Sequence, residues 1–198
     1  MGIRVDILAE VKEALEFINR FQDRDVINSL RYSINKTLVS LRKESIEEIR
    51  KRLNLKSTVL RQQYLKMERA KGSTITSIEG TMWYSGRAIP MLEFVAGNKD
   101  VIEQKGIKVK SRRKLRVRVV PGKSLRLDKA FIQRVHTKQV FKRSGKKGEF
   151  KKQGVVSVAT LLRDRGLGDK LASFAKARFG DVFLRDLAAR TDNRFTKG

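Results

Sequence analysis

The sequence predicts an α+β protein with N-terminal helices, a central antiparallel sheet of hairpins and a C-terminal helix. Three observations support this prediction. Apolar residues follow helical spacing over residues 25–53, β-branched and aromatic residues dominate after Gly72, and helical spacing returns after Asp169. Helices and strands occur in successive blocks, which favours α+β over a doubly wound sheet. The 198 residues are enough for one domain with a hydrophobic core.

The N-terminal third is predicted to be helical. Apolar residues within 25–53 recur mostly at three- and four-residue steps, which predicts an amphipathic helix of about eight turns. A shorter helix is expected to begin with Ser57 as its N-cap and to end at Gly72. Helical spacing over residues 3–21 also predicts a helical arm, residues 1–22, that packs on the domain or on a neighbouring molecule.

Residues 107–119 are expected to form a basic hairpin. Apolar and basic side chains alternate on either side of a turn at 111–113, which predicts two strands with one apolar face and one basic face. Pro121 and Gly122 are expected to turn the chain out of this hairpin.

A second hairpin is expected over residues 131–143, with its turn near His136. Residues 144–154 are rich in glycine and lysine and have little to bury, so a mobile loop is predicted there. Asp169 is expected to cap the C-terminal helix, and Gly180 marks a point where that helix could be interrupted.

The predicted elements divide the chain into three parts. They are a helical arm (residues 1–22), an α+β domain (residues 23–165) and a C-terminal helix with a tail (residues 166–198). Hydrophobic residues make up 40% of the chain and are spread along it, so a folded core is expected rather than disorder.

Positive charge is concentrated in residues 105–152. This stretch has 19 lysines and arginines against only two acidic residues, Asp128 and Glu149, so it carries +17 of the chain's net charge of +25. Repulsion among these positive charges opposes compaction of the stretch. We therefore expect it to meet a polyanion or a strongly acidic protein surface. The alternative is a solvated face that keeps the protein soluble. Like charges side by side on one sheet face argue against it, because cross-strand repulsion is destabilising.

The candidate contacts for a polyanion or an acidic partner lie in the first hairpin, at the end of the second and in the following loop. They are Lys108, Lys110, Arg112, Arg113, Lys114, Arg116, Arg118, Lys142, Arg143, Lys146, Lys147, Lys151 and Lys152. The same stretch has only three aromatic residues, Phe131, Phe141 and Phe150. Contact with nucleic-acid backbone phosphates is therefore expected, rather than stacking on bases.

The sequence predicts no catalytic, cofactor or metal site, and we expect a protein that is not an enzyme. Cysteine is absent and His136 is the only histidine, which excludes thiolate and clustered-histidine metal sites. Glu44, Glu47 and Glu48 fit a solvated helix face better than a cation site, because such sites usually draw on loops of spaced carboxylates. Residues 144–148 lack the pattern of a P-loop. No apolar run is long enough to cross a bilayer, so a soluble protein is expected.

The densest apolar cluster follows the first predicted strands. Its candidate residues for a subunit interface are Trp83, Tyr84, Ile89, Met91 and Phe94. An edge strand that joins subunits is one interpretation of this cluster. Core packing is the other, and it is expected for Trp83 and Leu92.

Five short motifs occur along the chain in a characteristic order. They are Asn35-Lys36-Thr37 in the long helix, Ile89-Pro90-Met91-Leu92-Glu93-Phe94 after the first strands, Gly106-Ile107-Lys108-Val109 in the basic hairpin, Ala130-Phe131-Ile132 and Val140-Phe141-Lys142-Arg143. In this order and spacing the chain resembles the minor tail protein Z family of tailed bacteriophages, the tail-completion proteins. The resemblance covers residues 30–162.

The resemblance implies that residues 23–165 form the tail-completion-like domain of a structural virion protein. It implies a place in the neck, at the head-proximal end of the tail, together with the tail terminator and head-tail connector proteins. The copies are expected to form a hexameric ring around the channel for genomic DNA. They would contact this DNA through its backbone. The protein would be synthesised in the host cytoplasm and reside in the virion. The lysine-rich segment 144–154, the arm and the C-terminal helix depart from the family pattern.

The alternative function is a stand-alone RNA- or DNA-binding protein of ribosomal or nucleoid type, which the strong positive charge also fits. A nuclease is disfavoured because Asp128 and Glu149 are isolated in the sequence, whereas nucleases cluster acidic metal ligands near their basic surface. Presence or absence in purified virions would separate the first two functions.

Overall fold

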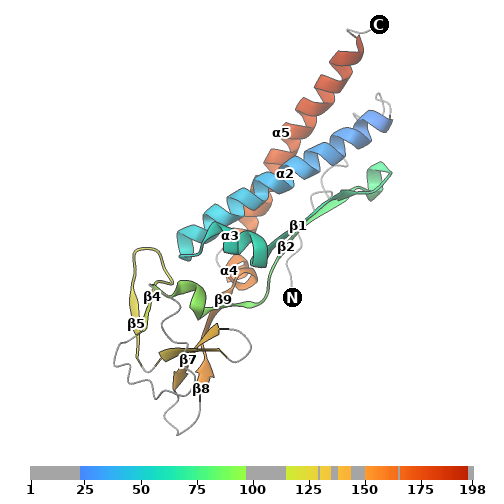
Figure 1. The fold of residues 1–198 in the computed structure, drawn as a ribbon. Coiled ribbons are helices and arrows are strands. Elements are labelled where there is room, and N and C mark those ends of the chain that lie inside the picture. Colours follow the sequence, from blue (N-terminus) through green and yellow to red (C-terminus); the bar gives the residue numbers. More distant parts are fainter. Residues whose placement is uncertain are drawn as a thin grey trace.

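Two long helices and several short antiparallel sheets make up the fold (Figure 1). The computed structural model describes residues 23–96, 115–128, 130–134, 138–143, 150–164 and 166–195. Helices at both ends of this region, with antiparallel strands between them, confirm the predicted α+β class. The predicted arm, residues 1–22, lies outside the described residues.

Helix α2 (Asp23–Arg52) confirms the long helix that the apolar spacing predicts. The side chains of Leu30, Ile34, Leu38 and Leu41 are fully buried along it. Burial of one such side chain contributes about 1.5–3 kcal/mol, so tertiary packing stabilises this helix far more than helix propensity does. Three basic residues in its last turn complement the negative end of the helix dipole.

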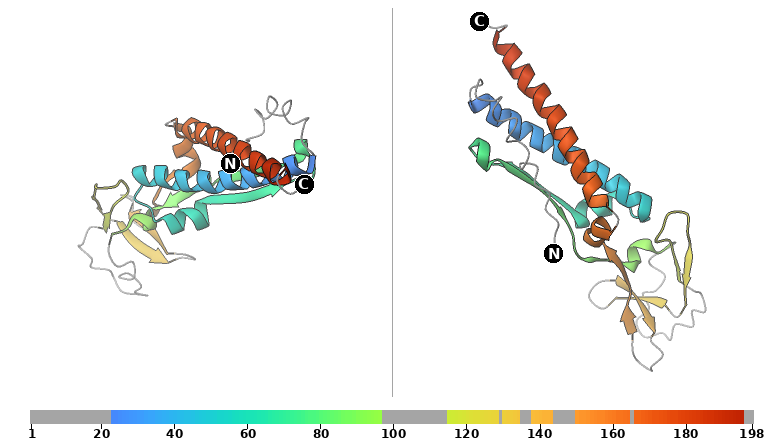
Figure 2. Two further views of the ribbon diagram at one scale, coloured as in Figure 1. Left: turned by 90° about the horizontal axis from the view of Figure 1, so that it is seen from above. Right: turned by 180° about the vertical axis from the view of Figure 1, so that it is seen from behind.

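Helix α5 (Leu167–Phe195) packs along α2 and completes the main hydrophobic core (Figure 2). Its buried residues recur every four positions: Leu167, Leu171, Ala175, Phe179, Phe183 and Leu187. The expected C-terminal helix is confirmed, but it begins at Leu167 rather than Asp169 and continues through Gly180. A glycine inside a helix costs only about 1 kcal/mol relative to alanine, which packing on both sides of Gly180 outweighs.

One buried charge joins the two long helices. The side chain of Glu48 is 7% exposed, and its Oε1 accepts hydrogen bonds from the ammonium groups of Lys51, at 2.5 Å, and Lys170, at 2.9 Å. These hydrogen bonds, first from Lys170 and then from Lys51, lower the pKa of Glu48 to about 2. The helix face that was expected to be solvated therefore contains one buried, paired carboxylate at the contact between α2 and α5.

The chain after α2 forms a short helical stretch and then a β-hairpin. The elements are α3 (Ser57–Val59), the π-helical turn η2 (Leu60–Tyr64), β1 (Leu65–Lys71), the 3₁₀ turn η3 (Ile75–Ser77) and β2 (Glu79–Tyr84). The second helix expected from Ser57 onward is therefore wrong beyond Tyr64, and Lys56 takes the N-cap position without a side-chain cap. Leu65 and Met67 contact the core while their neighbours are exposed. Over so few residues, this alternation is not distinguishable from helical spacing.

The β1–β2 hairpin lies against α2, on the side away from α5 (Figure 2). Asn35 of α2 accepts a 2.9 Å hydrogen bond at Oδ1 from the backbone N–H of Ala70. The guanidinium of Arg31 donates to the carbonyl oxygen of Gly72 through both Nε and Nη2. At Gly80, a Cβ would lie 2.6 Å from a side-chain atom of α2, so glycine permits this close approach. Helix α2 thus lies between α5 and the hairpin.

The remaining strands form separate small sheets rather than one central sheet. The elements are β3 (Ala88–Pro90), the 3₁₀ turn η4 (Met91–Phe94), β4 (Leu115–Val117), β5 (Leu125–Leu127), β6 (Ala130–Arg134), β7 (Lys138–Arg143), β8 (Phe150–Lys152), β9 (Gly154–Ser157) and α4 (Val158–Asp164). Within the described part of the chain, β3 pairs with β9, β4 with β5, and β7 with both β6 and β8. Sheets of two or three short strands are only marginally stable alone, so these sheets depend on contacts with the rest of the fold.

The structure changes the predictions for both hairpins. Since β4 pairs with β5, Pro121 and Gly122 lie within this hairpin rather than after it. The strand and turn expected over 107–113 lie outside the described residues. The second hairpin is confirmed by β6 and β7. Residues 150–152, expected in a mobile loop, form β8 instead, and residues 144–149 lie outside the described part.

No helix in the described ranges is both long enough and apolar enough to cross a membrane.

We expect Glu48→Gln to lower the free energy of unfolding by roughly 1.5–3 kcal/mol at pH 7, because the variant loses two charge-assisted hydrogen bonds. The pKa of Glu48 is lowered from 4.5 to about 2, so the contribution of the carboxylate is fully present above pH 4.5. It is lost as the pH falls from 4.5 towards 2. Urea unfolding of both proteins at neutral and acidic pH measures this difference.

Glu47→Gln is the matched control, since Glu47 is the exposed neighbour on the same helix. It should change the free energy of unfolding by less than about 0.5 kcal/mol. A destabilisation by Glu48→Gln that stays constant down to a pH of about 2 would show that the ionised carboxylate is not what stabilises the contact.

We also expect Gly72→Ala to destabilise the protein more than Gly122→Ala. Gly72 has a φ of 120°, and a Cβ there would lie 2.3 Å from the carbonyl oxygen of Ser77. Gly122 has a φ of 73° with no atom within 4 Å of the Cβ position, so alanine there meets only the left-handed backbone penalty of about 1–2 kcal/mol. Thermal unfolding compares the two, and equal melting temperatures would contradict the crowding at Gly72.

Candidate polyanion-binding surface

The β4–β5 hairpin places two arginines directly opposite one another. Arg116 pairs with Arg126 across the strands, and both side chains are exposed. The flanking pairs are Leu115 with Leu127 and Val117 with Leu125, and since alternate residues point to opposite faces, these apolar side chains share the other face. The predicted division into a basic face and an apolar face therefore holds for the described strands of this hairpin.

A second like-charged pair lies on the β6–β7–β8 sheet. Lys142 of β7 stands directly opposite Lys151 of β8, and both are exposed. Lys152 is also exposed but pairs with Phe141, so it points to the other face of the sheet. Both sheets lie at the end of the molecule where α2 ends (Figure 1).

Directly opposed like charges cost stability. A cross-strand pair contributes roughly 0.2–1 kcal/mol, and its sign is unfavourable when the two charges are alike. Two such pairs occur on these small sheets. A phosphate or carboxylate placed between the members of each pair would remove the repulsion, so both pairs are suited to binding an anionic partner.

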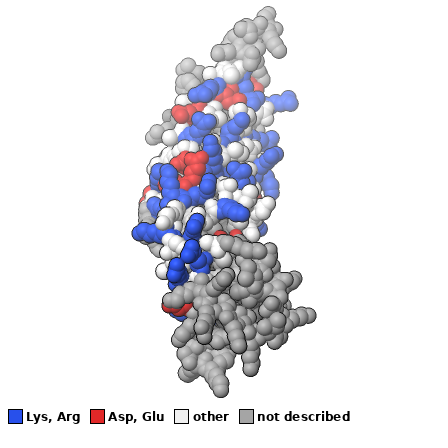
Figure 3. All heavy atoms as spheres, turned by 60° about the vertical axis from the view of Figure 1, so that its left-hand side comes forward, with Lys and Arg blue, Asp and Glu red and all other residues white. Residues whose placement is uncertain are grey.

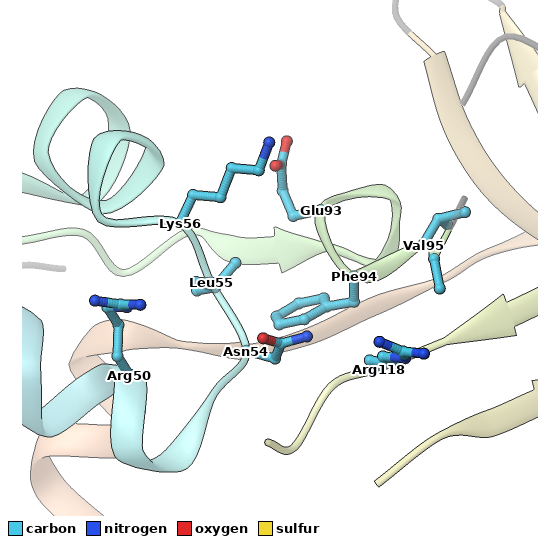
Figure 4. Close-up of a pocket in the computed structure, with 9 residues that line it drawn as sticks. Arg50, Asn54, Leu55, Lys56, Glu93, Phe94, Val95 and Arg118 are labelled. Atoms are coloured by element: carbon cyan, nitrogen blue, oxygen red, sulfur yellow. The ribbon is translucent and has the colours of Figure 1, made fainter. Parts of the chain in front are cut away.

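Arg118 extends this basic surface into a hollow of about 460 Å³ (Figure 4). The hollow is lined by Arg50, Asn54, Leu55, Lys56, Glu93, Phe94, Val95, Ala96 and Arg118. Two backbone hydrogen bonds of 2.8 Å hold its walls together: the N–H of Asn54 donates to the carbonyl oxygen of Val119, and the N–H of Arg118 donates to that of Phe94.

In Figure 4, Arg50 and Arg118 lie at opposite ends of the hollow, with Leu55 and Phe94 between them. Among the described residues of the lining, Glu93 is the only acidic one. A cationic rim over an apolar floor suits an acidic protein segment that also carries an apolar side chain. The carboxylate of Glu93 makes the hollow less suited to a nucleic-acid phosphate than the two sheets are.

The structure brings together part of the predicted basic site. Arg116, Arg118, Lys142, Lys151 and Lys152 are exposed, as predicted, and Arg143 lies on β7. The other predicted contacts lie outside the described residues: Lys108, Lys110, Arg112, Arg113, Lys114, Lys146 and Lys147.

The predicted subunit interface needs correction. Tyr84, Ile89 and Phe94 are at most 2% exposed, so their side chains belong to the core of this chain and do not form an accessible surface. Tyr84 also shares a 2.8 Å hydrogen bond between its hydroxyl and that of Ser45. Trp83, for which core packing was expected, is 39% exposed. The reason is that register pairs Tyr84 with Leu65 on the buried face, which turns Trp83 outward.

Sequence reasoning missed Arg126, Arg50 and Lys56. Arg126 lies in a Leu-Arg-Leu alternation that could have revealed a second strand, had Pro121 and Gly122 been assigned to the turn of this hairpin. Arg50 and Lys56 line the hollow because the end of α2 and the residues after it lie beside Phe94 and Arg118, and the sequence carries no signal for this proximity.

Basic residues are not confined to the two sheets. Figure 3 shows lysines and arginines over much of the helical part of one face, with acidic residues gathered in small groups. In the portion of the chain that the structure describes, no group of three or more His, Cys, Asp or Glu side chains could hold a metal ion.

No protein-family model, curated protein or solved structure matches this chain.

We expect Arg126→Gln to stabilise the fold and weaken polyanion binding at the same time. Relief of the Arg116–Arg126 repulsion should raise the free energy of unfolding by about 0.2–1 kcal/mol. Loss of one phosphate contact should reduce the slope of log K against log salt by about 0.9 for duplex DNA. Urea unfolding and fluorescence anisotropy with a labelled duplex at several salt concentrations measure the two effects.

Lys123→Gln is the matched control because Lys123 is exposed in the loop of the same hairpin, outside its three strand pairs. It removes the same charge without relieving a cross-strand pair, so the stability should stay unchanged. A lower stability of Arg126→Gln would refute the repulsion.

Proposed function

We propose that this protein is a structural subunit of a tailed-phage virion that completes the head-proximal end of the tail and helps to join it to the head connector. The proposal rests on two exposed cross-strand pairs of like charge on neighbouring small sheets. They are Arg116 with Arg126 and Lys142 with Lys151. The motif order resembles that of tail-completion proteins, and a basic surface of this kind suits a protein close to the DNA channel.

The motif residues have structural roles that fit a scaffold for such a surface. Asn35 holds the β1–β2 hairpin on α2, and Ile89 and Phe94 are buried in the core. Phe94 also accepts the backbone hydrogen bond that places Arg118 at the hollow. In this proposal the helical part forms the body of the subunit, and the sheets meet the DNA backbone or an acidic neighbour such as the tail terminator or the connector.

The basic sheets would bind through charge and not through base recognition. Arginine and lysine pairs on a sheet face can contact backbone phosphates in any sequence, which suits DNA that moves through a channel. Trp83 is the exposed aromatic side chain of β2, a different sheet, so it does not add a stacking surface to these pairs.

A stand-alone nucleic-acid-binding protein is the second candidate. It is favoured by the basic residues that Figure 3 shows over the helical part, beyond the two sheets. Such a protein would bind DNA or RNA tightly as an isolated chain, with a strong dependence on salt.

We expect virions produced without this protein to accumulate as separate DNA-filled heads and unattached tails, visible by electron microscopy. Supplying the wild-type chain should restore joined particles, and supplying the Arg116→Glu/Lys142→Glu variant should restore fewer of them. Lys176→Glu on α5 is the control for the change in charge, since Lys176 is exposed on a helix and belongs to neither basic sheet.

Normal joined particles without the protein would refute the structural role. Absence of the chain from purified virions, together with tight binding of the isolated chain to nucleic acid, would support the second candidate instead.

A further inference from the structure

The hollow beside β4 combines charges from separate segments of the chain. Arg50 belongs to the last turn of α2, Lys56 precedes α3 and Arg118 follows β4, and all three side chains are exposed. Glu93 of η4 is the acidic residue among the described lining, so three positive charges face one negative charge. The two basic sheets carry directly opposed like charges, whereas the hollow presents both signs of charge around an apolar floor.

Backbone contacts hold one wall of the hollow in place. The N–H of Ala96 donates a 3.0 Å hydrogen bond to the carbonyl oxygen of Arg116. Val95 forms an antiparallel bridge with Val117. These contacts place residues 94–96 alongside β4 as a short additional strand. A site whose walls are already hydrogen-bonded is largely pre-formed, which lowers the conformational cost of binding.

The negative charge of Glu93 has a fixed place in the hollow. In Figure 4 its carboxylate and the ammonium end of Lys56 point toward one another. Burial raises the pKa of the Tyr64 phenol, and the nearby carboxylate of Glu93 raises it further. Glu93 therefore lies beside Lys56 and Tyr64, whereas the cations at the two ends of the hollow are Arg50 and Arg118 (Figure 4).

We propose that the hollow binds a short acidic segment of a partner protein. One carboxylate of the segment pairs with Arg50 and a second pairs with Arg118, and the residues between them cross the floor that Leu55 and Phe94 form. A guanidinium presents a planar fork of donors that matches a carboxylate, so each pair can form two hydrogen bonds. The volume of about 460 Å³ accommodates only a few side chains, so the segment is short. This inference goes beyond the proposed function, because the hollow lies outside the two sheets and its occupant is a protein.

The charges of the hollow favour a protein segment over a nucleic acid. A nucleic-acid strand carries a negative charge at every nucleotide, so a strand that joins Arg50 to Arg118 brings phosphates close to Glu93. A protein segment can carry a carboxylate at each end and an uncharged residue beside Glu93. A single small anion is also disfavoured, because Leu55 and Phe94 lie between the two arginines (Figure 4).

Fluorescence anisotropy of labelled, capped peptides with the full chain tests the proposal at physiological salt. The probes carry two glutamates separated by a varied number of leucines, and each matched probe has the same composition with its glutamates adjacent. We expect Arg50→Gln and Arg118→Gln each to weaken binding of the best separated probe about tenfold, because each removes a charge-assisted pair. Arg178→Gln on α5, also exposed, is the matched control and should weaken binding by less than about twofold.

The matched probes and the control variant separate the hollow from general attraction between an acidic peptide and a basic chain. The probe with adjacent glutamates should bind about fivefold more weakly, because it can pair with only one arginine at a time. Equal affinity for both kinds of probe would overturn the proposal. Equal weakening by Arg50→Gln and Arg178→Gln would overturn it as well.

Duplex DNA separates the hollow from the two sheets. Arg50→Gln should leave the slope of log K against log salt for DNA unchanged and weaken peptide binding. Arg126→Gln should lower that slope and leave peptide binding unchanged. A lower DNA slope for Arg50→Gln would overturn the proposal, because the hollow would then be part of the nucleic-acid surface.

Disulfide trapping locates the peptide independently of charge, because the chain has no cysteine of its own. Asn54 is exposed and lines the hollow. Asn54→Cys should therefore form a mixed disulfide with a cysteine-tagged probe about tenfold more than Lys123→Cys, in the loop of the β4–β5 hairpin. Equal trapping at the two positions would overturn the proposal.

Sedimentation velocity distinguishes a partner protein from a second copy of this chain. Self-association of the wild type that Arg50→Gln abolishes would identify a second copy as the occupant and overturn the proposal. Sedimentation that is the same for both proteins supports a separate partner. Failure of these tests would leave the virion test unaffected, because that test uses substitutions on the two sheets and none in the hollow.

Discussion

The fold depends on the burial of α2 on two sides. Helix α5 covers one side and the β1–β2 hairpin covers the other, so α2 is the element through which these parts share a core. Polar contacts fix how the three elements lie: Arg31 and Asn35 hold the backbone of the hairpin, and Glu48 pairs with Lys170. The last pair spans 122 positions along the chain, so the core is complete only when the C-terminal helix has docked.

The basic sheets depend on this core without contributing much to it. Backbone hydrogen bonds from Asn54 to Val119 and from Arg118 to Phe94 connect the residues just after β4 to the residues just after α2 and to η4. The position of Arg116 is therefore set by the helical part, and its repulsion with Arg126 costs only a few tenths of a kcal/mol to about 1 kcal/mol. A core with many fully buried side chains tolerates such a cost, which lets positive charge gather on a small sheet.

The long helices and the α+β class could be predicted from the sequence because apolar spacing over many turns is a strong signal. β1 could not, since its alternation covers few residues and directly follows a helical stretch. Which face of β2 is buried could not be predicted from the sequence either. Whether Trp83 or Tyr84 faces the core is set by pairing with β1, and a shift of one residue exchanges the faces. The basic character of the site was evident from composition, but the Arg116–Arg126 pair requires the register that the turn at Gly122 creates.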